Sequence, residues 1–268
     1  MNSTISSHLF SAEIGPGLWL ISSDLSGPNE DGHSMKPGRA TSNSFLIEGD
    51  REALLIDLAV DEPGLVNYAQ ALTGKKVLLA LTHGHVDHTF RLNDNAREVW
   101  MHPDDIFLLR EGFAGPPVES MPSVHPLQDG DVIELGQRAV RVIHLAGHTP
   151  GSLLFYDLTT SVLFSGDTVT RRLLYGLHGF VPLKDFCASL GKLLSLPIAG
   201  IYSAHDRFAL KKEHIGAMIS VLSHADLSLM EPVSLPVQGR FYMYRNGVET
   251  DPDYFNWAVK LPENGDAL

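Results

Sequence analysis

Four apolar segments of this chain each end at a histidine or an aspartate that stands beside glycine or another small residue. The segments are short, and their composition predicts buried strands. The polar residues that follow them are His83, His148, Asp167 and His205. Loops at strand ends are where α/β folds usually build their sites. Any fold of this chain must therefore accommodate polar side chains at the ends of four buried strands. We expect these strand ends to meet at one edge of the fold.

The first of these loops is the richest in side chains that bind metals. The stretch Thr82–His88 reads Thr-His-Gly-His-Val-Asp-His, with three imidazoles and one carboxylate within six residues. Neutral imidazole and carboxylate together suit a divalent metal such as zinc. Together with the other three strand ends, this stretch gives a candidate set of seven metal ligands: His83, His85, Asp87, His88, His148, Asp167 and His205.

The order of the expected elements indicates the architecture. Antiparallel hairpins in both halves, with helices between them, predict two sheets packed face to face and covered by helices. We therefore expect an α/β (α+β) fold, a four-layer αββα sandwich. At 268 residues, the chain is expected to form a single domain over residues 1–268. Residues 1–12 are expected to be poorly ordered, and residues 228–268 to form a C-terminal extension with one strand over 240–245.

Three long loops border the expected ligand strands and are candidate walls of a substrate pocket. They span residues 24–43, 112–126 and 170–182. The second contains four prolines, which predict that it has no regular structure. A last helix is expected over residues 214–227.

Composition and charge exclude several classes of partner. A net charge of −12 argues against binding to nucleic acid or to anionic membrane surfaces, so we expect a small-molecule substrate. No segment approaches the roughly 18 consecutive apolar residues that span a bilayer. The single cysteine, Cys187, fits a reducing compartment, and residues 1–20 lack the pattern of a signal peptide. We expect a cytoplasmic protein, either a monomer or a homodimer.

The motifs around the candidate ligands are similar to those of one known family. The H-x-H-x-D-H motif of the metallo-β-lactamase superfamily is matched letter for letter by His83–His88. Further matches are His148 in Gly-His-Thr-Pro-Gly-Ser, Asp167 in Ser-Gly-Asp-Thr and His205 in Ser-Ala-His-Asp. Leu54–Asp57 resembles the early strand of the family and its acidic residue. The resemblance covers roughly residues 14–210.

The resemblance implies a role for each candidate ligand. One metal ion would take His83, His85 and His148, and a second would take Asp87, His88 and His205. Asp167 would bridge the two ions together with a water or hydroxide, and such pairs lie about 3.5–4 Å apart. Two zinc ions are expected, with iron or manganese as alternatives. Asp87 would also orient the hydroxide and so act in catalysis, and Asp57 would hold a ligand imidazole by its second nitrogen.

Resemblance to individual branches of the superfamily narrows the reaction. True metallo-β-lactamases have another residue, such as cysteine or serine, at the position of Asp167, so penicillin hydrolysis is disfavoured. Thioesterases of the type II glyoxalase kind and acyl-homoserine lactonases keep the aspartate. We therefore expect a metal-dependent hydrolase that cleaves a small thioester, lactone or ester.

Candidate substrate contacts follow Asp167 in the chain. The glutathione-binding segment of the glyoxalases is absent, since residues 168–173 read Thr-Val-Thr-Arg-Arg-Leu. Arg171 remains a candidate contact for an acidic substrate. The lactonases place a tyrosine where this chain has Thr170, and Tyr175 is the nearest substitute. His178 is the third candidate.

Two other activities use the same scaffold. Persulfide dioxygenases hold one iron with a subset of these residues and oxidise their substrate, and sequence spacing alone does not separate them from hydrolases. RNA-processing nucleases are the other alternative, which the acidic charge balance disfavours.

Overall fold

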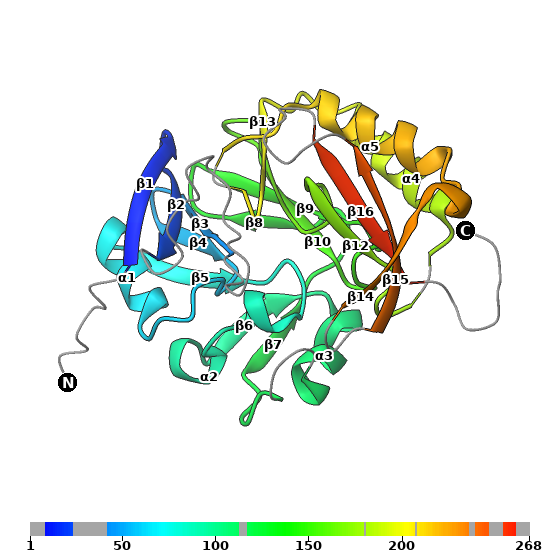
Figure 1. The fold of residues 1–268 in the computed structure, drawn as a ribbon. Coiled ribbons are helices and arrows are strands. Elements are labelled where there is room, and N and C mark those ends of the chain that lie inside the picture. Colours follow the sequence, from blue (N-terminus) through cyan, green and yellow to red (C-terminus); the bar gives the residue numbers. More distant parts are fainter. Residues whose placement is uncertain are drawn as a thin grey trace.

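Two large sheets pack face to face in this protein, with helices outside them and a third, smaller sheet at one side (Figure 1). The computed structural model describes residues 9–23, 42–112, 117–179, 181–206, 208–235, 239–246 and 254–260. The expected four-layer αββα sandwich is confirmed.

The first sheet has seven strands in the order β1-β2-β3-β4-β5-β6-β7. Neighbouring strands are antiparallel from β1 to β4 and parallel from β4 to β7. The strands are β1 (Leu9–Gly15), β2 (Leu18–Ser23), β3 (Ser44–Glu48), β4 (Glu52–Ile56), β5 (Lys76–Ala80), β6 (Glu98–Met101) and β7 (Ser123–Pro126).

The second sheet has five strands in the order β13-β11-β10-β9-β8. Its pairs are antiparallel except for β11 and β13, which are parallel. The strands are β8 (Val132–Glu134), β9 (Ala139–His144), β10 (Leu153–Asp157), β11 (Val162–Gly166) and β13 (Gly200–Ser203).

The central strands β3, β4, β10 and β11 are buried on both faces and are therefore largely apolar on both. In β3, Phe45 and Ile47 point into the core between the sheets, while Leu46 packs on the helical side. This division follows from the alternation of side chains along a strand. Phe155 and Phe164 of the second sheet complete the core between the sheets.

Helices cover the outer face of each sheet. Residues of α1 (Leu65–Thr73), α2 (Leu92–Asn95) and α3 (Ile106–Glu111) share a buried cluster with the first sheet. Those of α4 (Leu183–Leu193) and α5 (Glu213–Ser223) share one with the second. The buried side chains of α4 recur three or four residues apart, as an amphipathic helix requires: Leu183, Phe186, Cys187, Leu190 and Leu193. Three short 3-10 helices are η2 (Val86–His88), η3 (Pro103–Asp105) and η4 (Leu227–Leu229).

The third sheet joins the C-terminal part of the chain to the segment after Asp167. Its order is β12-β16-β15-β14, from β12 (Arg172–Tyr175), β16 (Phe255–Val259), β15 (Gly239–Asn246) and β14 (Glu231–Leu235). The loop expected over residues 170–182 is therefore wrong in part, since residues 172–175 pair in parallel with β16. The extension supplies three strands where the sequence predicted one.

Three other expectations about local structure are corrected. Residues 9–12, expected to be poorly ordered, begin β1 and pair with β2. Residues 123–126 form β7 in spite of the prolines around them, because β7 lies at the edge of its sheet, where proline is tolerated. The last helix runs over Glu213–Ser223 and so ends four residues before 227.

The pocket walls and the single domain expected from the sequence both remain predictions. Residues 24–41 and 113–116, which belong to the proposed pocket walls, lie outside the described residues. The single domain over residues 1–268 also stays a prediction. Among the described residues, no helix is long and apolar enough to cross a membrane.

Candidate metal centre

All seven candidate ligands lie together at one edge of the sandwich. Their ligand atoms form three groups, each within 4.8 Å: His83, His85 and His148; Asp87, His88 and His205; and His83, His88 and Asp167. We call the first of these the first triad and the second the second triad. His83, His148, Asp167 and His205 follow β5, β9, β11 and β13, so the strand ends converge as the sequence predicted.

The first triad brings three imidazole nitrogens to one point. His85 Nδ1 lies 3.0 Å from His83 Nε2 and 3.0 Å from His148 Nε2, and the other two nitrogens are 3.2 Å apart. Two nitrogens on one tetrahedral zinc, each at about 2.0–2.1 Å from the ion, lie about 3.3 Å apart. The three nitrogens therefore have the spacing that such an ion requires.

Electrostatics keep the first triad neutral. Burial lowers the pKa of His83 and of His85, and the neighbouring imidazoles lower both further. Burial also lowers the pKa of His148, against the opposing effect of Asp167. Neutral imidazole is the form that binds a metal, so these three residues have the required protonation state.

The second triad contains a carboxylate and is more open. Asp87 Oδ2 lies 3.8 Å from His88 Nε2 and 3.6 Å from His205 Nε2. The side chain of Asp87 is 23% exposed and that of His205 is 13% exposed, while His88 is fully buried. Burial lowers the pKa of His88, but Asp87, Asp57 and Asp167 outweigh this effect and raise it to about 9.

Asp167 lies between the two triads. Its Oδ2 is 3.1 Å from His205 Nε2 and 3.6 Å from His148 Nε2, and its Oδ1 is 3.5 Å from His88 Nε2. One carboxylate thus faces nitrogens of both triads, which is the placement a bridging ligand needs. Burial raises the pKa of Asp167, but His205, His88 and His148 lower it further than burial raises it.

Two buried atoms at this point fit a bound cation. His88 Nε2 and Asp167 Oδ1 are both buried, and neither makes a hydrogen bond to any of the described residues. A buried polar atom without a partner is costly, and most such atoms in proteins are satisfied. A metal ion between them would satisfy both the nitrogen and the carboxylate oxygen, which lie 3.5 Å apart.

Hydrogen bonds at the far side of the imidazoles fix their orientation. Asp57 Oδ2 lies 2.8 Å from His88 Nδ1 and accepts from the Thr82 hydroxyl at 2.7 Å. That hydroxyl is 3.0 Å from His83 Nδ1, and His148 Nδ1 is 2.8 Å from the carbonyl oxygen of Leu174. Each contact directs Nε2 of its imidazole toward the triads. Asp57 stands where the sequence predicted.

Comparison with known proteins places this geometry in a family. A family model described as the metallo-beta-lactamase superfamily matches residues 37–205. The chain belongs to the metallo-β-lactamase superfamily. The family resemblance expected from the motifs is therefore confirmed.

Relatives within the superfamily include two named hydrolases. Acyl-coenzyme A thioesterase MBLAC2 of Gallus gallus is 29% identical over 192 residues, covering 60% of this chain and 69% of that protein. Hydroxyacylglutathione hydrolase of Vibrio cholerae is 33% identical over 169 residues, covering 60% of each chain. The crystal structure of TTHA1623 in a di-iron-bound form is 31% identical with a TM-score of 0.51, covering 66% of this chain and 93% of that one.

Two of the three expected substrate contacts are buried away from the metal centre. Tyr175 is fully buried, packs on Phe186, and donates its hydroxyl to the carbonyl oxygen of Val181. Burial raises its pKa, as expected for a phenol in the core. Arg171 is 3% exposed, and its guanidinium lies over the rings of Phe208 and Tyr254. The structure thus gives both residues packing roles, because they belong to the core around the third sheet.

His178, the third expected contact, does reach the metal centre. Its Nε2 lies 2.9 Å from His85 Nε2, the nitrogen that does not face the first triad. Burial, His148 and Lys260 lower the pKa of His178 to about 4, so its imidazole is neutral at pH 7. His178 is half-buried, in keeping with a place at the border of the centre.

Sequence reasoning missed two residues that contact the ligand loops. The Ser42 hydroxyl donates to Asp87 Oδ2 at 3.2 Å and lies 3.4 Å from His205 Nδ1. Asp105 is fully buried and accepts hydrogen bonds from the loops that carry His83 and His148. Neither residue has a motif around it, and Asp105 resembles any acidic residue at a helix start.

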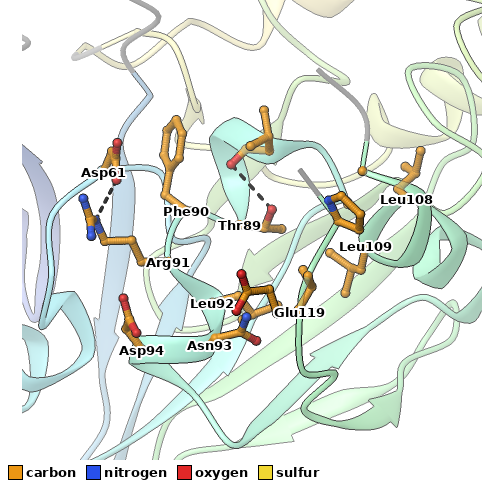
Figure 2. A pocket seen from close by; sticks show the side chains of 15 residues that line it. Asp61, Thr89, Phe90, Arg91, Leu92, Asn93, Asp94, Leu108, Leu109 and Glu119 are labelled. Carbon is orange, nitrogen blue, oxygen red and sulfur yellow. Dashed lines mark hydrogen bonds and ion pairs between the residues drawn. The ribbon is translucent and has the colours of Figure 1, made fainter. Parts of the chain in front are cut away.

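A separate cavity of about 540 Å³ lies on the outer side of the H-x-H-x-D-H loop, bordered by α2 and α3 (Figure 2). Apolar side chains that include Phe90, Leu108 and Leu109 line it, and Arg91 and Asp61 form an ion pair of 2.7 Å at its border (Figure 2). Gly84 and Val86 of the loop line the cavity, but none of the seven candidate ligands does.

Proposed function

We propose that this chain is a metal-dependent hydrolase with a two-metal site, and that its substrates are small thioesters. The observation that carries the proposal is the position of Asp167, whose carboxylate faces nitrogens of both triads. Two metal ions would use the contacts on both sides of this carboxylate, whereas one ion would leave those on one side unused. Relatives named as a thioesterase and a hydroxyacylglutathione hydrolase support the choice of thioesters.

Zinc is the metal we propose. Imidazole and carboxylate ligands suit zinc, and they also suit iron, which occupies the related structure TTHA1623. When bound, such a pair of ions lowers the pKa of water and polarises the carbonyl group of the substrate.

The residues of the chain prepare the site for this chemistry. The contacts of Asp57 and of the Leu174 carbonyl hold His88 and His148 with Nε2 turned inward. Burial of the first triad excludes water from one side of the site. Asp87 has the most exposed side chain among the ligands of the second triad, so a substrate would enter on that side. Asp87 would orient a water molecule there for attack on the thioester carbonyl carbon. The C–O bond of the acid product would form as the C–S bond breaks, and the thiolate would leave toward solvent and take up a proton.

We propose a small-molecule substrate, no nucleic acid partner and a cytoplasmic location. The first two rest on the net charge of −12, and the location rests on the single cysteine, which leaves no intrachain disulfide and fits a reducing compartment.

Metal analysis of the purified protein, followed by a substrate panel, tests the function. The panel contains acyl-coenzyme A thioesters, S-acyl glutathione, acyl-homoserine lactones and RNA, with oxygen consumption measured on a persulfide. We expect two metal ions per chain and release of thiol from thioesters, with RNA left intact. One iron per chain with oxygen consumption would refute the proposal in favour of a dioxygenase.

A further inference from the structure

Asp105 is a buried carboxylate at the start of α3 that does not cap its own helix. Its side chain makes no hydrogen bond to the first turn of α3, although aspartate often does so at this position. It is fully buried, and the described residues form no ion pair with it. The carboxylate is instead directed at two loops of the metal centre.

Three hydrogen bonds join Asp105 to these loops. Oδ2 accepts from the backbone N–H of Gly84 at 3.1 Å and from the Thr149 hydroxyl at 2.7 Å. Oδ1 accepts from the backbone N–H of Gly151 at 2.7 Å. Gly84 stands between His83 and His85 in the chain.

One carboxylate therefore connects every loop of the first triad. The loop before Asp105 in the chain supplies His83 and His85, and the loop at Thr149 supplies His148. The two loops belong to different sheets, since one follows β5 and the other follows β9. Two direct links between these segments avoid the imidazoles: the Asp105 carboxylate, and the backbone hydrogen bond from the Leu153 N–H to the Thr82 carbonyl oxygen at 2.7 Å.

The two glycines allow the loops to approach the carboxylate closely. A Cβ atom at Gly151 would lie 2.7 Å from Asp105 Cγ and Oδ1. A Cβ at Gly84 would lie 2.8 Å from the Asp105 carbonyl oxygen and from Leu108 Cβ. Both distances are too short for a side chain, so Gly151 makes room for the Asp105 carboxylate, and Gly84 makes room for the backbone of residue 105 and for Leu108.

We propose that Asp105 is the positioning residue of the first triad, which sets the distance of His148 from His83 and His85. The proposal rests on the metal site of the proposed function, because it assumes that these imidazoles hold a metal. Asp105 touches no ligand and no substrate, and it acts through the backbone of both loops.

The variant Asp105→Asn tests the proposal with little change in volume. Its amide nitrogen would face one of the donors from Gly84, Thr149 or Gly151, so at least one hydrogen bond is lost and the loops separate. We expect the affinity of the first triad for metal to fall about 10–100-fold, the range seen when a group supporting a ligand is removed. Competition with a chelator measures this affinity, and cobalt absorption reports the geometry of the three imidazoles.

Asp104→Asn is the matched control, because it makes the same change one residue earlier on a side chain that is 61% exposed. It should bind metal as the unmodified protein does. Thr149→Val removes one of the three donors without touching the carboxylate and should cause a smaller loss of affinity. This second variant keeps the test valid if Asp105→Asn does not fold.

Two results would overturn the proposal. One is an Asp105→Asn protein whose metal affinity and cobalt spectrum match those of the unmodified protein. The other is a protein with a lower melting temperature without metal but an unchanged affinity, since this would show a purely structural role. The readout is metal binding, so a protein that binds metal but cleaves no thioester would refute the proposed function and leave this proposal standing.

Discussion

The two triads of the metal centre are built differently. The first consists of three buried imidazoles, each of which has a partner at its other nitrogen. The second includes the partly exposed Asp87 and His205, which share contacts with Ser42. We therefore predict that the first triad binds a metal ion on its own. The metal affinity of the second triad should depend on the neighbouring carboxylates and be more sensitive to solvent.

The pKa values of the imidazoles also differ between the two triads. Burial lowers the pKa of each imidazole in the first triad, so these are neutral without metal. Three carboxylates raise the pKa of His88 in the second triad to about 9. Negative charge gathers on the second side, which is where a second cation is needed most.

The largest effect is expected from Asp167→Ala, because this residue faces both triads. Hydrolysis should fall by more than about 100-fold, since even loss of a group that only supports a ligand costs 10–100-fold. Metal content and thiol release measure the effect, with the exposed Asp104→Ala as control. A fully active, metal-free Asp167→Ala protein would contradict the two-metal proposal.

Removing one ligand from each triad in turn should show whether the two triads bind their metal ions independently. His205→Ala should lose one metal and keep the other in the first triad, because the buried imidazoles there are untouched. His83→Ala should lose the metal of the first triad. Metal content per chain is the measurement, and a loss of both ions from His205→Ala would show that the first triad does not bind on its own.

Asp57→Asn should have a smaller effect, about 10–100-fold on metal affinity. Asp57 contacts His88 Nδ1 directly but reaches His83 only through the Thr82 hydroxyl. The second triad should therefore lose more affinity than the first. Titration with a chelator measures each step, and equal losses at both would argue against the assigned contacts.

Ser42→Ala should have the smallest effect. Its contacts to Asp87 and His205 are 3.2 and 3.4 Å, longer than those of Asp57. We expect the affinity of the second triad for its metal ion to fall a few-fold, since the net contribution of one such hydrogen bond is about 0.5–1.5 kcal/mol. Dialysis against a chelator should release the second ion sooner from this variant, while release of the first stays unchanged.

The convergence of the candidate ligands could be predicted from sequence because the strand ends that carry them have a local signal. His83, His148, Asp167 and His205 all follow an apolar strand, and strand ends of packed sheets meet at one edge. The hairpins and helices likewise predicted the sandwich. Asp57 was singled out by the resemblance of Leu54–Asp57 to the early strand of the family, and it directly follows β4.

Residues whose role depends on distant pairing could not be predicted. Tyr175 follows a ligand by only eight residues, but its strand pairs with β16 and turns it into the core. Arg171 is buried by Tyr254, which lies far along the chain. Asp105 has no local signal because its partners, two backbone N–H groups and the Thr149 hydroxyl, belong to two separate loops.

The third sheet has a consequence for how the protein matures during synthesis. His148 is held by the carbonyl of Leu174, and within the described part of the chain the strand of Leu174 pairs with β16 alone, in the register Leu174↔Ala258. At about 5–20 residues per second, β16 is made about 4–17 s after β12. A growing chain therefore carries every metal ligand before the strand that supports His148 exists. Metal that arrives early would meet an unfinished site.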